Sequence, residues 1–432
     1  MKVLLVNYRY FVSGGPERYL FNLSSLLAAH GHETVPFSVR YDRNEPTEYS
    51  KYFVAPLSDE SEVYFKDQRR DARSIRKTME RAFYSPEVYR SLASLIEAEK
   101  PDAAVVLHYL RKLSPAVIKC LHEHAIPFAV RLSDFGMVCP NAHLLRDDAP
   151  CELCVTGSLL NSVRYRCVQG SLAASAVNYA ATQYHRRAGY FDLIPKFLVP
   201  STFTREKMLE AGWPETRLVH LPTFVEVGTD ASTHATPATV VYVGRLEHTK
   251  GVHVLLEAVL KLSARDNAPS FTLRVVGDGD REYATSLKDF VARNDLQDVT
   301  FDGALSAADV RSALRAATCS VAPSLWYENM PNSVLESLAE ATPVIASDHG
   351  SLRELIEDGI TGRLVRPGDP VELADALFGM LTDAGAIAKM GRAGLEFVAK
   401  HHSPDRHYEI LMDVLTSVGV ESGHSQEQPA WT

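Results

Sequence analysis

The sequence predicts an α/β protein with two domains, each built around a parallel β-sheet that helices cover on both faces. The chain has 432 residues, and a typical domain holds about 150, so more than one domain is expected. Short runs of β-branched residues alternate with helical periods, the order that produces parallel sheets. Runs such as AAVV and VVYV are apolar at every position, which indicates strands buried on both faces.

Eight strands follow from these apolar runs. We expect them at residues 3–6, 103–107, 128–132 and 197–199 in the first half, and at 240–243, 273–276, 319–322 and 344–346 in the second. The stretch GTDASTHATPAT between the halves has no apolar period and is rich in Gly, Pro, Ser and Thr, as linkers are. The sequence therefore predicts domains at 1–228 and 240–402, a linker at 229–239 and a disordered tail at 419–432.

Composition narrows the class of protein. Hydrophobic residues make up 46% and charged residues 23%, which excludes a disordered or collagen-like chain. The 45 basic and 54 acidic residues leave a net charge of -9, which argues against nucleic acid as a partner. The first residues are too short an apolar run for a signal peptide, and nowhere do 18 apolar residues follow one another. We expect a cytoplasmic protein whose six cysteines are mostly reduced.

Two cations follow the first strand of the second half. Gly244 and Arg245 come directly after TVVYV, and Lys250 precedes a helix whose apolar residues recur at helical spacing. Such a loop lies at the carboxyl end of a strand, beside helix N–H groups that favour anions. The pattern fits a diphosphate, although a solvated basic pair on an ordinary loop is the more frequent explanation of such residues alone.

Two glutamates eight positions apart occur in LWYENMPNSVLESLAE. Glu328 is expected in a loop, and Glu336 in the first turns of a helix that begins near Asn332. Carboxylates can accept hydrogen bonds from sugar hydroxyls, and the intervening backbone N–H groups can face phosphate. Two exposed acids favoured by a helix dipole remain the alternative.

Glycine turns follow two other strands. Gly14 and Gly15 join the first strand to a helix, and Gly277 opens GDGD after LRVV. Glycine permits close approach of a backbone to a ligand, but a tight turn explains the first pair equally well. The second is only a fragment of a nucleotide-binding fingerprint.

Together, the Gly-Gly turn, GRLEHTKG, VVGDGD, FDGALS and the paired glutamates resemble the large retaining glycosyltransferase family four, also called glycosyl transferases group one. The resemblance spans nearly the whole chain. It implies the glycosyltransferase-B fold, in which two Rossmann-like domains face each other across a cleft. It also implies a final helix, at 403–418, that returns to the first domain.

The resemblance assigns roles to these residues. Arg245 and Lys250 would neutralise the leaving nucleoside diphosphate without a metal ion, Glu336 would hold the ribose hydroxyls, and Glu328 would lie by the donor sugar. The other implied donor contacts come from both domains: Gly14, Gly15, Gly244, Gly277, Asn329, Met330, Pro331 and Asn332.

The first domain departs from the family pattern. His108 matches the second of two expected histidines, but Ser133 stands where a His-Asp pair would have its histidine, before Asp134. Serine cannot carry a proton near neutral pH. His108 or Asp134 is the expected substitute, and a structural histidine at a strand end is an equal alternative for His108.

Four cysteines, at 139, 151, 154 and 167, form a Cys-x11-Cys-x2-Cys-x12-Cys group. Cys139, Cys151, Cys154 and Cys167 would suit a structural zinc site, or they are reduced thiols packed as small apolar residues. Residues 66–81 carry seven basic and three acidic side chains, so the segment 64–84 is a candidate for contact with anionic lipid, or else an ordinary solvated helix face.

The function that this resemblance implies is retaining transfer of a hexose from a nucleotide diphosphate sugar to a hydroxyl of a glycan or a lipid-linked glycan. A nucleotide-sugar epimerase with the same architecture is one alternative, and a donor-binding protein without catalysis is another. The sequence does not specify the base, the sugar or the linkage.

Overall fold

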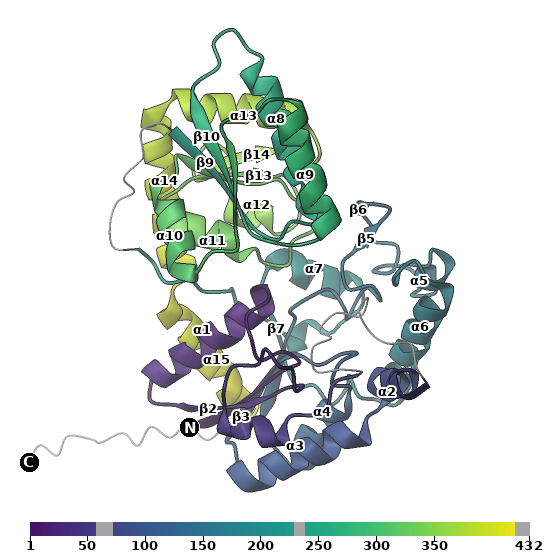
Figure 1. Ribbon diagram of the computed structural model, residues 1–432. Helices are drawn as coiled ribbons and strands as arrows, with labels where there is room; N and C mark the ends of the chain where they lie inside the picture. The colour runs from purple at the N-terminus through teal and green to yellow at the C-terminus, as the bar shows by residue number, and fades with distance from the viewer. Residues whose placement is uncertain (58–71, 229–237, 420–432) are drawn as a thin grey trace, which may run out of the picture.

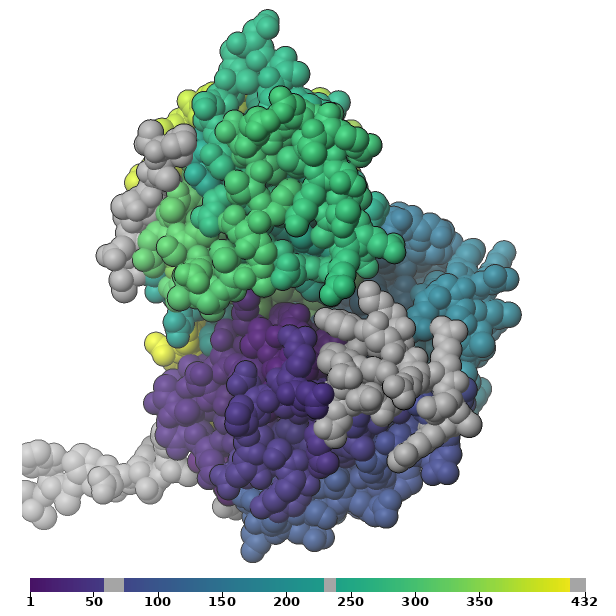
Figure 2. All heavy atoms as spheres, viewed as in Figure 1, coloured from purple at the N-terminus to yellow at the C-terminus, as the bar shows by residue number. Residues whose placement is uncertain are grey.

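The computed structural model describes residues 1–57, 72–228 and 238–419. Two lobes are joined at a narrow waist, and each is a parallel sheet between layers of helices (Figures 1 and 2). The tail predicted at 419–432 and the linker predicted at 229–239 lie almost wholly outside the described residues. The α/β fold with two parallel sheets, expected from the sequence, is confirmed.

The first domain has a six-stranded parallel sheet. Its strands lie in the order β2 (Glu33–Phe37), β1 (Lys2–Asn7), β3 (Ala103–His108), β4 (Phe128–Arg131), β7 (Phe197–Val199) and β8 (Leu218–His220). A small antiparallel hairpin, β5 (Leu145–Arg146) and β6 (Ala149–Pro150), projects from this domain. Its helices are α1 (Gly15–Ala29), η1 (Glu48–Tyr52), α2 (Ala72–Phe83), α3 (Pro86–Glu99), α4 (Ala116–Glu123), α5 (Asn161–Arg164), α6 (Leu172–Arg187), α7 (Thr202–Glu210) and η3 (Glu215–Arg217).

The second domain repeats this plan. Its strands lie in the order β11 (Val299–Gly303), β10 (Phe271–Val276), β9 (Ala238–Val243), β12 (Cys319–Ala322), β13 (Val344–Ser347) and β14 (Gly362–Val365), all parallel. The helices are η4 (His248–Lys250), α8 (Val252–Ser263), α9 (Arg281–Arg293), α10 (Ala307–Ala316), α11 (Asn332–Ala339), α12 (Leu352–Leu355), α13 (Pro370–Thr382) and α14 (Ala384–His401). None of the helices described in either domain is both long and apolar enough to cross a bilayer.

All eight strands expected from the sequence are present, and they form the interior of the two sheets. The four further strands are the edges: β2 and β8 in the first sheet, β11 and β14 in the second. An edge strand pairs on one side only and is less completely covered. Its sequence therefore lacks the continuous apolar run by which the interior strands were found.

The last helix, α15 (Pro404–Ser417), belongs to the first domain by its packing. Its apolar residues Leu411, Val414 and Leu415 join one hydrophobic cluster with β1 and α1. His407 anchors the helix: its Nε2 lies 2.9 Å from the hydroxyl of Tyr19, and its Nδ1 lies 2.7 Å from the carbonyl oxygen of Pro222. The chain therefore crosses to the second domain and returns.

The buried imidazole of His407 makes this packing sensitive to acid. Burial, aided by the charge of Arg131, lowers the pKa of His407 to about 3, whereas an unfolded histidine titrates near about 6.5. Between these values the unfolded chain binds one more proton, so unfolding becomes easier as the pH falls from about 6.5 towards 3. We expect His407→Gln to flatten this slope by up to about 1.4 kcal/mol per pH unit, measured by urea denaturation.

The exposed His122 provides the matched control. His122→Gln should leave the pH dependence of the wild-type protein intact. Equal slopes for the wild type and His407→Gln would contradict the assignment of this sensitivity to His407.

Candidate active site

A buried ion pair joins two loops of the second domain. The ammonium of Lys250 lies 2.7 Å from Oε1 of Glu328. Gly251 makes the approach possible: it has a φ of 70°, and a Cβ there would lie 1.9 Å from the carbonyl oxygen of Pro323. Because Lys250 follows β9 and Glu328 follows β12, the pair lies at the carboxyl edge of the sheet, where α/β proteins bind ligands.

Glu328 is held as a carboxylate. Ser324 Oγ donates to its Oε1 at 2.6 Å, and Trp326 Nε1 donates to the same oxygen at 3.1 Å. Burial alone would raise the pKa of the Glu328 carboxyl, but the Lys250 ammonium and these two donors outweigh it, and the pKa lies below its ordinary value. A fixed negative group thus lies beside a fixed positive group.

Arg245 and the two loop glycines are placed differently from Lys250. The Arg245 guanidinium is half-exposed and lies 2.7 Å from Glu247, not against Glu328. The N–H groups of Gly244 and Gly277 donate to the carbonyl oxygens of Val276 and Gly303. These glycines therefore bring neighbouring loops together, while the Arg245 side chain is left at the surface.

Glu336 lies on α11 and faces the first domain. Its Oε1 accepts from Arg18 of α1, and its buried Oε2 has no hydrogen-bond partner in the part of the chain that the structure describes. A Cβ on Gly15 would lie 3.7 Å from the side-chain amide of Asn332. The Gly14–Gly15 turn and the start of α11 thus face each other across the domain boundary.

The loop before α11 also bridges the domains. The Asn329 side chain donates to the carbonyl oxygen of Leu132 at 2.8 Å and accepts from the hydroxyl of Thr204 at 2.6 Å. Met330 packs against the second domain's apolar cluster, and Pro331 directly precedes α11. Segment 328–336 thus touches both domains.

In the first domain, His108 and Asp134 form a pair at the ends of β3 and β4. His108 Nε2 lies 3.1 Å from Asp134 Oδ2, and both residues line a pocket together with Ser133. Burial alone would raise the pKa of Asp134, but the imidazole, Arg111 and the N–H of Gly136 outweigh it, so the pKa falls below its ordinary range. The Ser133 hydroxyl donates to the carbonyl oxygen of Leu107 at 2.7 Å.

Sequence reasoning missed three side chains near these groups. Arg18 reaches Glu336 from another domain, and Trp326 stacks obliquely on His143, with ring centroids 5.1 Å apart. Burial lowers the pKa of His143. Arg18 and His143 stand outside the motifs found in the sequence. Trp326 lies within LWYENMPNSVLESLAE, two positions before Glu328, and this position was the signal that could have identified it.

The zinc prediction is not supported. Burial raises the pKa of the Cys154 thiol to about 12, with further contributions from Cys139, Cys167 and Cys151, so the four thiols do lie near one another. Across the described ranges, however, no three His, Cys, Asp or Glu side chains are arranged to hold a metal ion. The Cys139 thiol instead donates to the side-chain oxygen of Asn141 at 2.9 Å. The group behaves as packed thiols in a loop.

The second domain is similar in sequence to known proteins. Residues 237–383 match the family described as glycosyl transferases group 1. The match lies in the second domain. A phosphatidyl-myo-inositol mannosyltransferase of Mycobacterium leprae is 33% identical over 164 residues, which cover 38% of this chain and 42% of that protein. A D-inositol 3-phosphate glycosyltransferase of Salinispora tropica is 34% identical over 182 residues, 40% of this chain and 37% of that protein. These matches thus span less than half of each relative.

Solved structures match over the whole length. The sucrose-phosphate synthase of Thermosynechococcus elongatus superposes with a TM-score of 0.71 at 17% identity, covering 96% of this chain and 98% of that one. An Anabaena protein solved in complex with UDP gives 0.64 at 16% identity, covering 96% and 100%. At such identities the likeness establishes the fold, which is glycosyltransferase-B.

A further contact between the domains lies apart from the loops that contain Lys250 and Glu328. The Glu354 carboxylate of α12 accepts from the backbone N–H groups of Thr202 and Phe203 at the start of α7. A carboxylate at a helix N-terminus contributes roughly 1 kcal/mol. We expect Glu354→Gln to weaken this contact and raise the radius of gyration of the protein in small-angle scattering.

Glu357→Gln, on the exposed loop after α12, is the control and should give the wild-type scattering curve. Identical curves for all three proteins would show that Glu354 does not hold the domains together.

Proposed function

We propose that this protein is a retaining glycosyltransferase that moves a hexose from a nucleotide diphosphate sugar to a hydroxyl of a glycan or lipid-linked glycan. One observation carries the proposal. The Lys250–Glu328 pair lies at the carboxyl edge of the second sheet, and Glu336, eight residues later, meets the first domain.

On the donor side, Lys250 and Arg245 supply positive charge where the diphosphate departs. Preorganised cations of this kind stabilise the charge that develops in the transition state. Each typically raises the rate by about 10² to 10³. Glu336 accepts ribose hydroxyls through Oε2, the atom without a protein partner among the described residues. Glu328 accepts a hydroxyl of the donor sugar through the lone pairs that Lys250 leaves available.

On the acceptor side, the His108–Asp134 pair takes the place of the missing histidine at 133. Asp134 accepts a hydrogen bond from Nε2–H, which leaves Nδ1 as the ring nitrogen available to the acceptor hydroxyl; this atom is buried and has no partner in the described chain. The acceptor hydroxyl approaches the same face of the sugar that the diphosphate leaves, and the departing phosphate oxygen takes its proton. No protein nucleophile and no metal ion are required in this scheme.

The relatives favour this class of reaction. The matched proteins include a mannosyltransferase, an inositol phosphate glycosyltransferase and a glycogen synthase of Mycobacterium tuberculosis. A solved neighbour contains UDP and glucose. Their names include lipid-linked, small-molecule and glycan acceptors. The proposal therefore names two classes of acceptor, a glycan and a lipid-linked glycan.

Two substitutions test the donor site. Lys250→Met removes the buried cation, and Glu336→Gln removes the negative charge aimed at the ribose; each should lower sugar transfer at least about 10²-fold. Nucleotide sugars are first screened by thermal shift. A ligand at one hundred times its dissociation constant stabilises the folded protein by about 2.7 kcal/mol. Transfer is then measured with the donor that stabilises.

Matched controls exist in the same domain. Lys261→Met changes an exposed lysine of α8, and Glu282→Gln changes an exposed glutamate in the first turn of α9. Both should retain wild-type transfer. Turnover that survives Lys250→Met and Glu336→Gln rejects the site, and a new sugar nucleotide formed without acceptor identifies an epimerase instead.

A further inference from the structure

One flank of the first domain exposes an unusual amount of apolar surface. Among the described residues, seven of the ten large apolar side chains that are exposed lie on α2, α5, α6 and the turn before α5. We call this surface the α6 flank and define it by these residues: Ile75, Met79, Leu153, Leu160, Tyr165, Leu172 and Tyr184. The three others, Val12, Ile360 and Val371, are scattered elsewhere.

The flank is built from helices that contact one another. Leu172 and Tyr184 are 54% and 40% exposed near opposite ends of α6. On α2, Ile75 and Met79 share a stripe with Phe83, whose ring lies 5.8 Å from that of Tyr184. Helix α6 contacts both α2 and α5, and the three helices occupy the outer edge of the lower lobe in Figure 1.

Charge sets the flank apart from the rest of the molecule. Residues 153–191 contain no Asp, Glu or Lys and four arginines, a net charge of +4. The net charge of the whole chain is -9, so the residues outside 153–191 have a net charge of -13. The arginines are Arg164, Arg166, Arg186 and Arg187, and no carboxylate of the described chain lies within ion-pair distance of any of them.

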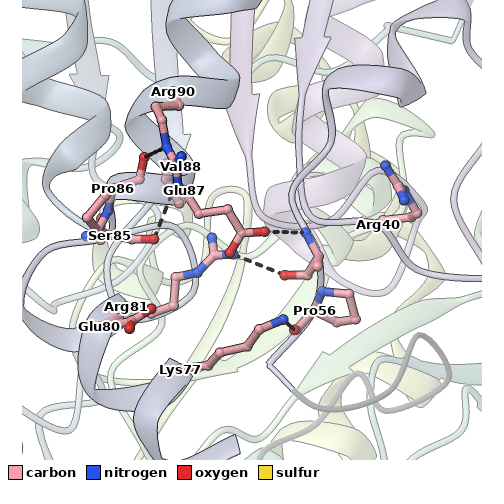
Figure 3. Close-up of polar contacts among 12 residues, drawn as sticks. Arg40, Pro56, Lys77, Glu80, Arg81, Ser85, Pro86, Glu87, Val88 and Arg90 are labelled. Carbon is pink, nitrogen blue, oxygen red and sulfur yellow. Dashed lines mark hydrogen bonds and ion pairs between the residues drawn. The ribbon is translucent and has the colours of Figure 1, made fainter. Parts of the chain in front are cut away.

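The basic residues of α2 contribute less than the sequence predicted. Arg81, counted in the candidate lipid-binding segment 64–84, is fully buried and paired with Glu87 at 3.1 Å (Figure 3). Arg76 pairs with Glu80, and Lys77 donates to the carbonyl oxygen of Pro56. Residues 64–71 of that segment lie outside the described residues. Among the described residues, the positive charge of the flank that has no carboxylate partner is therefore supplied by the four arginines of segment 164–187.

We propose that the α6 flank docks this protein onto a membrane surface that contains anionic lipid. Exposed leucines and tyrosines can enter the interfacial region of a bilayer, and arginines beside them bind lipid phosphates. The flank lies on an outer edge of the molecule (Figure 2), as contact with an extended surface requires. The inference goes beyond sugar transfer and does not depend on it.

Vesicle flotation of the full-length protein tests the docking. Phosphatidylcholine vesicles with phosphatidylglycerol should capture the protein, phosphatidylcholine alone should capture much less, and added salt should release it. Leu160→Glu combined with Leu172→Glu places two acids in the flank and should lower the partition coefficient at least about tenfold. Ile360→Glu with Val371→Glu changes equally exposed residues of the second domain and should leave binding unaltered.

The arginines are tested separately. Arg164→Gln, Arg166→Gln and Arg187→Gln should each lower binding to the phosphatidylglycerol vesicles about fivefold and leave residual binding to phosphatidylcholine unchanged. Donor-induced thermal stabilisation should stay at the wild-type value in every flank variant, which separates this inference from the proposed function and also verifies folding.

Three results would overturn the proposal. They are no binding of the wild type to phosphatidylglycerol vesicles, equal binding to both vesicle types, or equal losses in the flank and control pairs. Light scattering provides a further outcome: a dimer of the wild type that Leu160→Glu with Leu172→Glu dissociates would assign the flank to a second copy of this chain instead.

Discussion

The buried contact between Lys250 and Glu328 is the constraint on which the candidate site depends. A carboxylate as buried as Glu328 is costly unless a cation and hydrogen-bond donors surround it. The cation comes from the loop after β9, and the donors come from the loop after β12. Gly251 is required between them, because only a residue without a Cβ can pass the Pro323 carbonyl at that distance. The two loops therefore hold each other in place.

The same segment that contains Glu328 continues into the contacts between the domains. Asn329 bonds to both Leu132 and Thr204, and Glu336 accepts from Arg18. One segment thus forms part of both the candidate site and the domain boundary. A donor that binds Glu336 through Oε2 leaves the Arg18 contact at Oε1 in place, so binding and domain closure are compatible on the proposed function.

The parts of the fold that the sequence predicted share one physical property. Interior strands such as those at 103–107 and 344–346 are covered on both faces, so burial selects an apolar residue at every position. The edge strands were not predicted because they contain both polar and apolar residues. Strand β2 has the sequence ETVPF, and β11 has the sequence VTFDG. The donor loops were predictable for a related reason, since their charged residues follow directly on interior strands.

The first-domain site could be predicted only in part, because its geometry comes from register and not from local sequence. Val106 pairs with Val130 across β3 and β4, and this register brings the imidazole of His108, at the end of β3, to the carboxylate of Asp134, three residues beyond the end of β4. Ser133 lines the same pocket, but its hydroxyl donates to the Leu107 carbonyl. The residue at 133 therefore contributes no imidazole to this pocket, and the imidazole present there is that of His108, held by Asp134 on the neighbouring strand. The strand register, which a single sequence does not display, is what brings these two side chains together.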